Sequence, residues 1–441
     1  MISIDEAYTS KITEAKKLIE DRDFFRIFSH YDADGVSSAL ILAESLRRMN
    51  KNFHLSFLRS LDLEVIAESS EYPLILSDLG SDIREDFRSN NLIIVDHHIS
   101  SSSSGSAINL NPRKFGYDGT REACSATVSF LLSMALDSSN SDLFPAFIAG
   151  VIGDKQNVGG FNGINGKIVE SLRGQYQSSK DLNLVGKSIS EAIFLSIDPY
   201  FDGLSGNLES SRYFLQNLGI DPDTPMMNLR TDEKEKIVDS LTLQLIKQDS
   251  ASEGYETLVS DVFNFKNLGL SGNQLCDYFD AAGRNGKMGL PTSWIMGNEE
   301  AKEEMYSLSI RLKKEALEQI RRSIGSKREL ENIHIVYVEN PYLAGITASA
   351  MMVYIVKRSK PVVALYKNKD TKVSGRASRE LVTKGIDLSN AISRAASAVG
   401  GHGGGHDIAA GGEIPFDMEE EFLKKLNEEL GDQLGRTKKS P

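Results

Sequence analysis

The sequence predicts an α/β protein in which a parallel-sheet domain with a helical insertion is joined by a long helix to a smaller α/β domain. Short, continuously apolar runs are separated by helical patterns over residues 24–155, which indicates a parallel sheet buried on both faces. Glu and Lys or Arg are interleaved at helical spacing over 298–324, which predicts a charged connector helix. A second series of apolar runs and helical patterns begins at Ile333.

The elements of the first domain follow from the spacing of its apolar residues. Apolar residues at helical spacing between Ala7 and Ile19 predict a first helix, and an apolar face after Gly35 predicts a second. Short, mainly apolar runs predict the strands. The expected helices cover 5–21, 36–49, 124–135 and 144–155, and the expected strands lie within 24–28, 53–58, 72–80 and 91–95. A strand is the alternative for 144–155, since periodicity does not separate helix from strand over so short a run.

The rest of the chain is mostly helical in pattern up to the connector. Gly325 stands where a helix C-terminus favours glycine, so the connector helix is expected to end there. Further strands are expected at 333–339, 361–366 and 372–377, and helices at 232–247, 342–357, 388–398 and 417–430. The predicted domains are 1–200 for the sheet domain, 201–297 for its helical insertion, 298–330 for the connector helix and linker, and 331–441 for the smaller domain.

Composition excludes several classes of protein. No apolar run is long enough to cross a bilayer, and the N-terminus lacks the pattern of a signal peptide. Cys124 and Cys276 lack a metal-type spacing and are expected to be ordinary buried thiols of a cytoplasmic protein. The net charge of −12 disfavours coating of nucleic acid by bulk electrostatics. Residues 354–384 nevertheless hold nine Lys or Arg against two acidic residues, which suits a solvated face or a backbone-binding groove.

Four segments of the first domain end in possible metal ligands. An Asp-rich turn or a helix cap would explain any one of them, and a buried core pair would explain two adjacent histidines. Acids at four buried segment ends are costly unless they bind a cation. Carboxylate and imidazole donors without a thiolate favour Mn²⁺, with Mg²⁺ as the alternative, and their number suits two ions. The residues are His30, Asp32, Asp34, Asp78, Asp96, His97, His98 and Asp154.

These motifs resemble the DHH phosphoesterase superfamily. The resemblance rests on His30–Gly35, on Asp96-His97-His98 after an apolar strand, and on Gly153-Asp154. The segment Gly403–Gly411 resembles the glycine-rich motif of the DHH-associated domain, and Asp280–Arg284 resembles a segment of RecJ-like exonucleases. The resemblance covers most of the chain, and the similarity is greatest to archaeal RecJ-like nucleases, which are related to a non-catalytic subunit of the eukaryotic replicative helicase.

The resemblance implies a role for each residue of the first domain. It implies that His30, Asp32 and Asp78 hold one ion, and that Asp34, Asp78, His97 and Asp154 hold the other. Asp96 would orient an imidazole, as metal-bound histidines require. His98 and Arg284 would act on the scissile phosphate, although an ordinary surface arginine is the alternative for Arg284.

The C-terminal domain supplies the expected substrate-binding residues. Seven glycines between Gly400 and Gly412 would let backbone amides approach a phosphate, whereas a flexible hinge is the alternative. The resemblance implies that Arg376 grips the nucleic-acid backbone, and His402 lies just outside the matched motif. The expected residues are Ser374, Arg376, Gly401, His402, Gly403, Gly404, Gly405 and His406.

The expected function is a two-metal, single-strand-specific exonuclease that releases mononucleotides from DNA or RNA in replication, repair or RNA processing. An oligoribonuclease or cyclic-dinucleotide phosphodiesterase shares the same catalytic parts, but chain length and the helical insertion disfavour it. A non-catalytic replisome scaffold, binding proteins such as GINS, is the third hypothesis. The complete ligand set disfavours scaffolding as the sole function.

Overall fold

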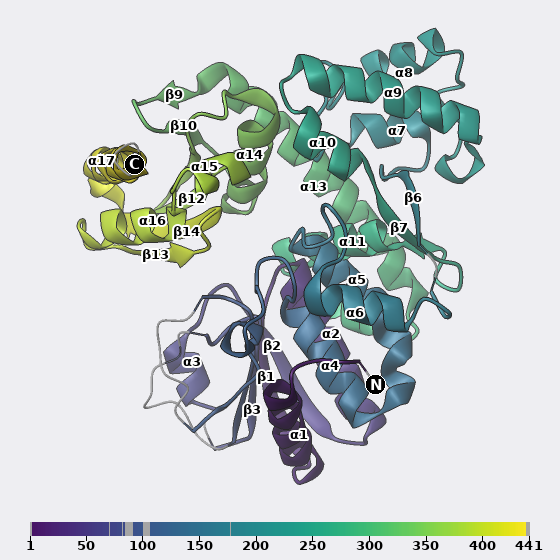
Figure 1. The fold of residues 1–441 in the computed structure, drawn as a ribbon, viewed down its shortest axis with the longest axis vertical. Coiled ribbons are helices and arrows are strands. Elements are labelled where there is room, and N and C mark those ends of the chain that lie inside the picture. Colours follow the sequence, from purple (N-terminus) through teal and green to yellow (C-terminus); the bar gives the residue numbers. More distant parts are fainter. Residues whose placement is uncertain are drawn as a thin grey trace. The chain divides into compact units, whose positions relative to one another are not determined.

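The computed structural model describes residues 2–69, 71–81, 83, 91–99, 106–176 and 178–437. The chain forms two units, each built from two separate segments (Figure 1). Unit 1 comprises Met1–Asp181 and Ser260–Ile310, and unit 2 comprises Leu182–Val259 and Arg311–Pro441. The predicted α/β class is confirmed: a parallel sheet with helices forms the core of unit 1, and a second sheet with helices lies in unit 2. The domain limits given above stay predictions.

The sheet of unit 1 has the strand order β2-β1-β3-β4-β5, and every neighbouring pair is parallel. Its strands are β1 (Phe24–His30), β2 (Asn52–Leu58), β3 (Leu74–Ser77), β4 (Leu92–Val95) and β5 (Ile108–Asn109). The order reverses between β1 and β3. In open parallel sheets, ligands bind at such a point, outside the carboxyl ends of the strands.

Alternate residues of these strands face two different cores. Phe25, Ile27 and Ile75 pack with the helices on one face, whereas Phe28 and Leu76 pack with Ile66 on the other. The first face is covered by α1 (Glu6–Glu20), α2 (Ala33–Arg48), α4 (Ser125–Leu136) and α5 (Phe144–Gly153), and the second by α3 (Leu63–Ala67) (Figure 1). Burial on both faces explains the almost unbroken apolar sequences of β3 and β4, whereas the edge strand β2 is partly exposed and alternates apolar with polar residues.

The remaining elements of unit 1 complete its helical layer. They are η2 (Pro112–Phe115), η3 (Ser138–Leu143), α6 (Gly163–Ser171), a small sheet of β6 (Ser178–Leu182), β7 (Val259–Phe265) and β8 (Leu270–Ser271), then α11 (Gly272–Arg284), α12 (Gly289–Ile295) and the first part of α13 (Glu299–Ser326). Helix α11 packs against both α2 and α5. Its N-terminus has a capping box in which Ser271 and Gln274 exchange hydrogen bonds.

Unit 2 contains a mixed sheet of order β13-β14-β12-β11-β10-β9. Its strands are β9 (Arg328–Glu329), β10 (His334–Tyr337), β11 (Val362–Lys367), β12 (Asp370–Arg376), β13 (His402–Gly405) and β14 (Ala409–Pro415). The accompanying elements are η5 (Pro341–Leu343), α14 (Ala344–Ala350), η6 (Met351–Ile355), α15 (Arg379–Thr383), α16 (Leu388–Ser397), η7 (Phe416–Met418) and α17 (Glu419–Thr437). The helix expected over 342–357 is therefore broken into a 3-10 turn, a short α-helix and a π-helical turn.

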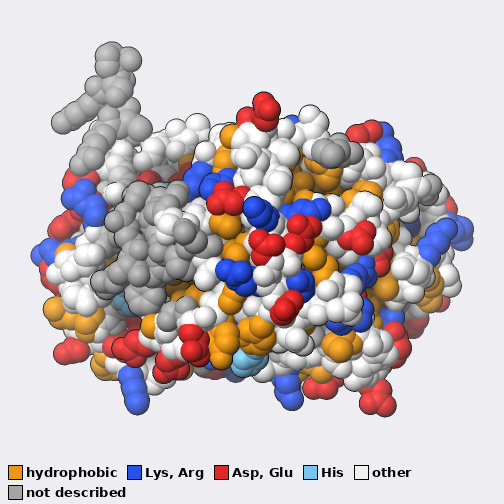
Figure 2. All heavy atoms as spheres, turned by 90° about the horizontal axis from the view of Figure 1, so that it is seen from below, with side chains coloured by type: hydrophobic (Ala, Val, Ile, Leu, Met, Phe, Trp, Pro, Cys, Tyr) orange, Lys and Arg blue, Asp and Glu red, His pale blue; other side chains and the backbone are white. Residues whose placement is uncertain are grey.

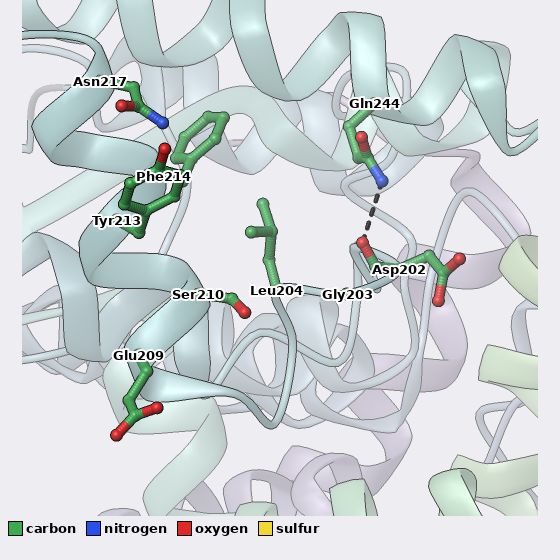
Figure 3. Close-up of a pocket in the computed structure, with 9 residues that line it drawn as sticks. All are labelled: Asp202, Gly203, Leu204, Glu209, Ser210, Tyr213, Phe214, Asn217 and Gln244. Carbon is green, nitrogen blue, oxygen red and sulfur yellow. Dashed lines mark hydrogen bonds between the residues drawn. The ribbon is translucent and has the colours of Figure 1, made fainter.

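The other segment of unit 2 is helical and has its own apolar core, to which Leu317 and Ile320 of α13 contribute. It consists of α7 (Ile189–Phe194), α8 (Leu208–Asn217), η4 (Met226–Asn228), α9 (Thr231–Lys247) and α10 (Ala251–Leu258). A cavity of about 500 Å³ lies between α8, α9 and the turn at 202–204 (Figure 3). Gln244 donates a hydrogen bond to the carbonyl oxygen of Asp202 at its rim (2.9 Å). Within the described residues, no helix is both long and apolar enough to span a bilayer.

Candidate metal centre

Three of the predicted ligand segments lie at the carboxyl ends of neighbouring parallel strands. His30 is the last residue of β1, Asp78 directly follows β3, and Asp96 directly follows β4. Because β1, β3 and β4 are adjacent and parallel, their ends meet at one edge of the sheet. The fourth segment reaches the same edge because Asp154 is the C-cap of α5, which packs against α2.

A first group of possible ligands forms around His30. Its Nδ1 atom lies 3.0 Å from Oδ2 of Asp32 and 3.4 Å from Oδ2 of Asp78. Asp32 is the N-cap of α2 and accepts a hydrogen bond from the amide of Gly35 (3.0 Å). The side chains of His30 and Asp32 are partly exposed, so this group opens to solvent.

A second, more deeply buried group forms around His97. Its Nε2 atom lies 3.2 Å from Oδ2 of Asp154, 3.4 Å from Oδ1 of Asp78 and 3.8 Å from Oδ2 of Asp34. Asp78 therefore faces both groups, with one carboxylate oxygen toward each. The structure thus brings together all six residues expected to hold metal.

The tautomer of His97 suits a metal ligand. Nδ1 of His97 lies 2.6 Å from the carbonyl oxygen of Gly119, which can only accept, so Nδ1 carries the proton. Nε2 is then directed at three carboxylates. Metal-bound histidines commonly hold one ring nitrogen in this way and bind the ion through the other. The donor set, oxygen and imidazole nitrogen, also fits Mn²⁺ or Mg²⁺.

The carboxylates of the second group repel one another. Burial raises the pKa of Asp34 well above its usual range, and the charges of Asp154 and Asp78 raise it further. Burial likewise raises the pKa of Asp154 to about 6, with Asp78 adding to the shift and His97 opposing it. Without a cation, the group therefore retains protons that a free carboxyl would have lost. A divalent cation would replace those protons.

This electrostatic arrangement would make the binding of a cation by these carboxylates depend on pH. The pKa of Asp154 is raised in the folded state, so the metal-free protein loses stability as pH rises from 4 through about 6. Binding a cation requires the carboxylate, so Mn²⁺ affinity should rise about tenfold per pH unit below pH 6 for each proton displaced. Calorimetric titration with Mn²⁺ at pH 5 and pH 7 measures this. Equal affinities at the two pH values would contradict the assignment.

Asp96 and His98 form a pair beside these groups. Asp96 accepts hydrogen bonds from the amides of Ser81 (2.8 Å) and His97 (2.7 Å), and its Oδ1 atom lies 2.7 Å from Nδ1 of His98. Burial opposes ionisation of Asp96, but the charge and hydrogen bond of His98 outweigh it and lower the carboxyl pKa. His98 is held by this carboxylate while its side chain remains 39% exposed, so it can meet a substrate.

Arg284 lies close to the first group because α11 approaches the β1–α2 loop tightly. A β-carbon on Gly283 would lie 1.6 Å from the carbonyl oxygen of Tyr31, so only glycine permits this approach. Nε of Arg284 donates to Oδ2 of Asp280 (2.6 Å). Burial opposes ionisation of Asp32, but the charge and hydrogen bond of His30, with a smaller contribution from the charge of Arg284, lower its pKa. Arg284 is thus largely buried beside a possible metal ligand and is not an ordinary surface arginine.

Several residues around this site carry no signal in the sequence. Gln156 donates a hydrogen bond (3.0 Å) to the carbonyl oxygen of Gly119, the same atom that accepts from His97. Asn165 in turn donates to the side-chain oxygen of Gln156 (2.8 Å). Neutral side chains such as these have no characteristic spacing. The thiol of Cys124 lies within 4.8 Å of carboxylate oxygens of Asp34 and Asp154. Burial raises the pKa of this thiol well above its usual range, so it stays protonated and the donors remain carboxylate oxygen and imidazole nitrogen.

The expected substrate-binding residues lie in unit 2. Arg376, at the end of β12, donates to the hydroxyls of Ser349 (3.1 Å) and Ser374 (3.3 Å) and to the carbonyl oxygen of Gly375 (2.8 Å). His402–Gly405 and Ala409–Pro415 pair as antiparallel strands, so the glycine-rich segment is an edge hairpin. A β-carbon on Gly403 would lie 2.8 Å from Ile392 of α16, whereas one on Gly404 would meet open space. His406 follows β13 directly.

The basic stretch 354–384 is largely neutralised by acidic partners. Six of its nine basic side chains form ion pairs with glutamates of unit 2: Arg358, Lys360, Lys367, Lys372, Arg379 and Lys384. Acidic and basic side chains are also intermixed over the face seen in Figure 2, where neither sign forms a continuous patch. Specific contacts such as those of Arg376 are thus better candidates for substrate binding than bulk charge.

Comparison with known proteins identifies two family domains. The DHH family N-terminal domain matches residues 25–151, and the DHHA1 domain matches residues 331–432. A protein of Methanocaldococcus jannaschii, MJ0831, is 32% identical over 450 residues, covering 97% of this chain and 98% of that protein.

Solved structures share the fold. RecJ from Thermus thermophilus in complex with Mn²⁺ has a TM-score of 0.60 at 14% identity, and Cdc45 from Entamoeba histolytica has a TM-score of 0.64 at 12% identity. The matches cover 98% and 96% of this chain. The chain spans 56% of the Thermus RecJ chain and 99% of the Cdc45 chain. The two family domains show that the chain belongs to the DHH superfamily, with a DHH domain followed by a DHHA1 domain, and its fold is similar to that of RecJ.

Proposed function

We propose that the protein is a metal-dependent exonuclease that releases mononucleotides from single-stranded DNA or RNA. The observation that carries this proposal is the position of Asp78, whose two carboxylate oxygens face two groups of ligands. A carboxylate shared between two ions is the usual arrangement for in-line displacement at phosphorus. The Mn²⁺ complex of the Thermus protein, which has the same fold, supports the choice of metal.

Each group would hold one ion. His30, Asp32 and Asp78 would hold the partly exposed ion, and Asp34, Asp78, His97 and Asp154 would hold the buried one. Two divalent ions, when bound, would lower the pKa of water and withdraw charge from the phosphate.

The chain's other residues would position the substrate around these ions. His98, oriented by Asp96, would donate a hydrogen bond or a proton to the phosphate or the leaving oxygen. Arg284 is held beside Asp32 by its ion pair with Asp280. There its guanidinium would neutralise a phosphate bound at the partly exposed ion.

Digestion of end-labelled single-stranded DNA and RNA with Mn²⁺ or Mg²⁺ tests the function. A ladder that shortens by single nucleotides is expected, with mononucleotides as the product. Rapid turnover of dinucleotides or cyclic dinucleotides with no attack on long strands would favour a small-substrate phosphodiesterase. A metal-loaded protein that hydrolyses neither class would favour a scaffold, and co-purification with replication proteins such as GINS would then be the next measurement.

Arg376 is proposed to bind the strand and not to take part in hydrolysis. Its guanidinium is oriented by two hydroxyls and one carbonyl oxygen, so it is preorganised to bind a phosphate of the strand. Arg376→Ala should raise KM for long strands about tenfold, with kcat and Mn²⁺ affinity nearly unchanged. Arg321→Ala, which removes an exposed arginine of α13, is the matched control. A fall in kcat with unchanged KM would contradict this role.

A further inference from the structure

The N-terminus of α4 contacts two of the proposed metal ligands. The amides of Ser125 and Ala126 donate to the two carboxylate oxygens of Asp34, at 2.8 and 2.9 Å. The hydroxyl of Ser125 donates to Oδ1 of Asp78 at 3.0 Å. One turn of helix thus fixes Asp34 through the main chain and Asp78 through a side chain.

The backbone of Asp78 is held in place by its neighbours, so the carboxylate can change its orientation only by rotation of the side chain. Asp78 has a φ of 55°, a conformation that costs energy for a residue other than glycine. Its amide donates to the carbonyl oxygen of Val95 (2.8 Å). The preceding residue, Ser77, is tied to α2 by a 2.5 Å contact between its hydroxyl and that of Ser38.

The Ser125 hydrogen bond distinguishes the two oxygens of Asp78. Oδ1, which accepts from Ser125, is the oxygen that faces Nε2 of His97 (3.4 Å). Oδ2 faces Nδ1 of His30 (3.4 Å). Rotation of the carboxylate would exchange or misplace these oxygens, and the hydroxyl of Ser125 opposes that rotation.

The geometry points to Ser125 as a positioning residue, whose hydroxyl holds the carboxylate of Asp78 in the orientation that serves two metal ions at once. This inference rests on the proposed function, because it takes Asp78 as the shared ligand. Ser125 is fully buried and is not expected to touch substrate. Its effect is therefore on the ions, through Asp78.

Three variants separate this role from a structural one. Ser125→Ala removes the hydroxyl and keeps the amide that holds Asp34. Ser125→Cys fills the same space with only a weak donor, so it serves even if the alanine variant does not fold. Ser133→Ala is the matched control, since Ser133 is a fully buried serine of α4 whose hydroxyl accepts from Ser45 (2.7 Å).

Calorimetric titration of the full-length proteins with Mn²⁺ is the main measurement. Loss of a hydrogen bond to a metal ligand typically weakens metal affinity 10–100-fold, so S125A and S125C should bind at least one ion about that much more weakly. S133A should bind both ions as the wild type does. The electron paramagnetic resonance spectrum of the Mn²⁺-loaded protein should show a coupled pair in wild type and S133A, and reduced coupling in S125A.

The outcomes distinguish failure of this inference from failure of the proposed function. A wild-type protein that binds no Mn²⁺ pair would refute the proposed metal centre itself. A wild type with a coupled pair, and S125A and S125C with the same affinities and coupling, would overturn only the role of Ser125. An equal loss of Mn²⁺ affinity in S133A would also overturn the role of Ser125, because any buried serine of α4 would then have the same effect.

Discussion

Asp34→Ala is expected to abolish Mn²⁺-dependent hydrolysis, with kcat reduced at least ~10³-fold, since loss of an ion forfeits several kcal/mol of transition-state stabilisation. Asp34 is 1% exposed, and both its oxygens are held by amides of α4. Alanine removes a proposed ligand of the buried ion and leaves those two amides without an acceptor, which costs about 1–3 kcal/mol of folding stability.

Two measurements separate these effects. The melting temperature of the metal-free variant reports the lost hydrogen bonds, and the rise in melting temperature on adding Mn²⁺ reports the lost ligand. Asp23→Ala is the matched control, because the Asp23 side chain is 97% exposed and its ion pair with Lys51 lies at the surface. Continued Mn²⁺-dependent release of mononucleotides by purified D34A protein would show that Asp34 is not a required metal ligand.

Gly283→Ala should damage stability and activity together. In the native backbone the new β-carbon would lie 1.6 Å from the carbonyl oxygen of Tyr31, far inside van der Waals contact. Helix α11 or the β1–α2 loop must move, at a cost of about 1–3 kcal/mol or more. Tyr31 lies between His30 and Asp32, so the movement displaces two proposed ligands, and a shift of about 1 Å lowers turnover roughly 100-fold.

Gly325→Ala provides the control for this substitution. Gly325 is also a helical glycine, in α13, but a β-carbon there meets no atom within 4 Å. Alanine at 325 should be neutral or stabilising by up to about 1 kcal/mol, because it restricts the unfolded chain. Thermal unfolding and the single-strand digestion assay measure both variants. A G283A protein with wild-type melting temperature and activity would show that α11 can shift without disturbing the loop.

The parallel sheet was predictable because burial on both faces makes β3 and β4 almost entirely apolar. The carboxyl ends of adjacent parallel strands meet, so the proximity of His30, Asp78 and Asp96 follows once the strand order is known. The sequence alone does not give that order: β1 lies between β2 and β3, although β2 precedes β3 in the chain. The roles assigned to these residues stay predictions.

Other features could not be predicted, for identifiable reasons. The glycine-rich segment has too few side chains to show the alternation of a strand, yet its backbone pairs as β13 and β14. Ser125 and Gln156 are neutral residues whose importance depends on contacts distant in sequence. The apolar face of a helix also does not show which element the helix packs against. Helix α9 shares a core with Leu317 of α13, but the sequence of α9 shows only that one face is apolar.

The two-segment construction of unit 1 has a consequence for synthesis on the ribosome. The proposed ligands up to Asp154 emerge early, but α11, with Gly283 and Arg284, follows only after the helical segment 182–259 has been made. About 130 residues separate Asp154 from Arg284, which at about 5–20 residues per second is roughly 7–26 s of translation. During that interval the nascent chain exposes the surfaces of α2 and α5 that α11 later covers. A polypeptide released early would carry the acidic loops without their arginine.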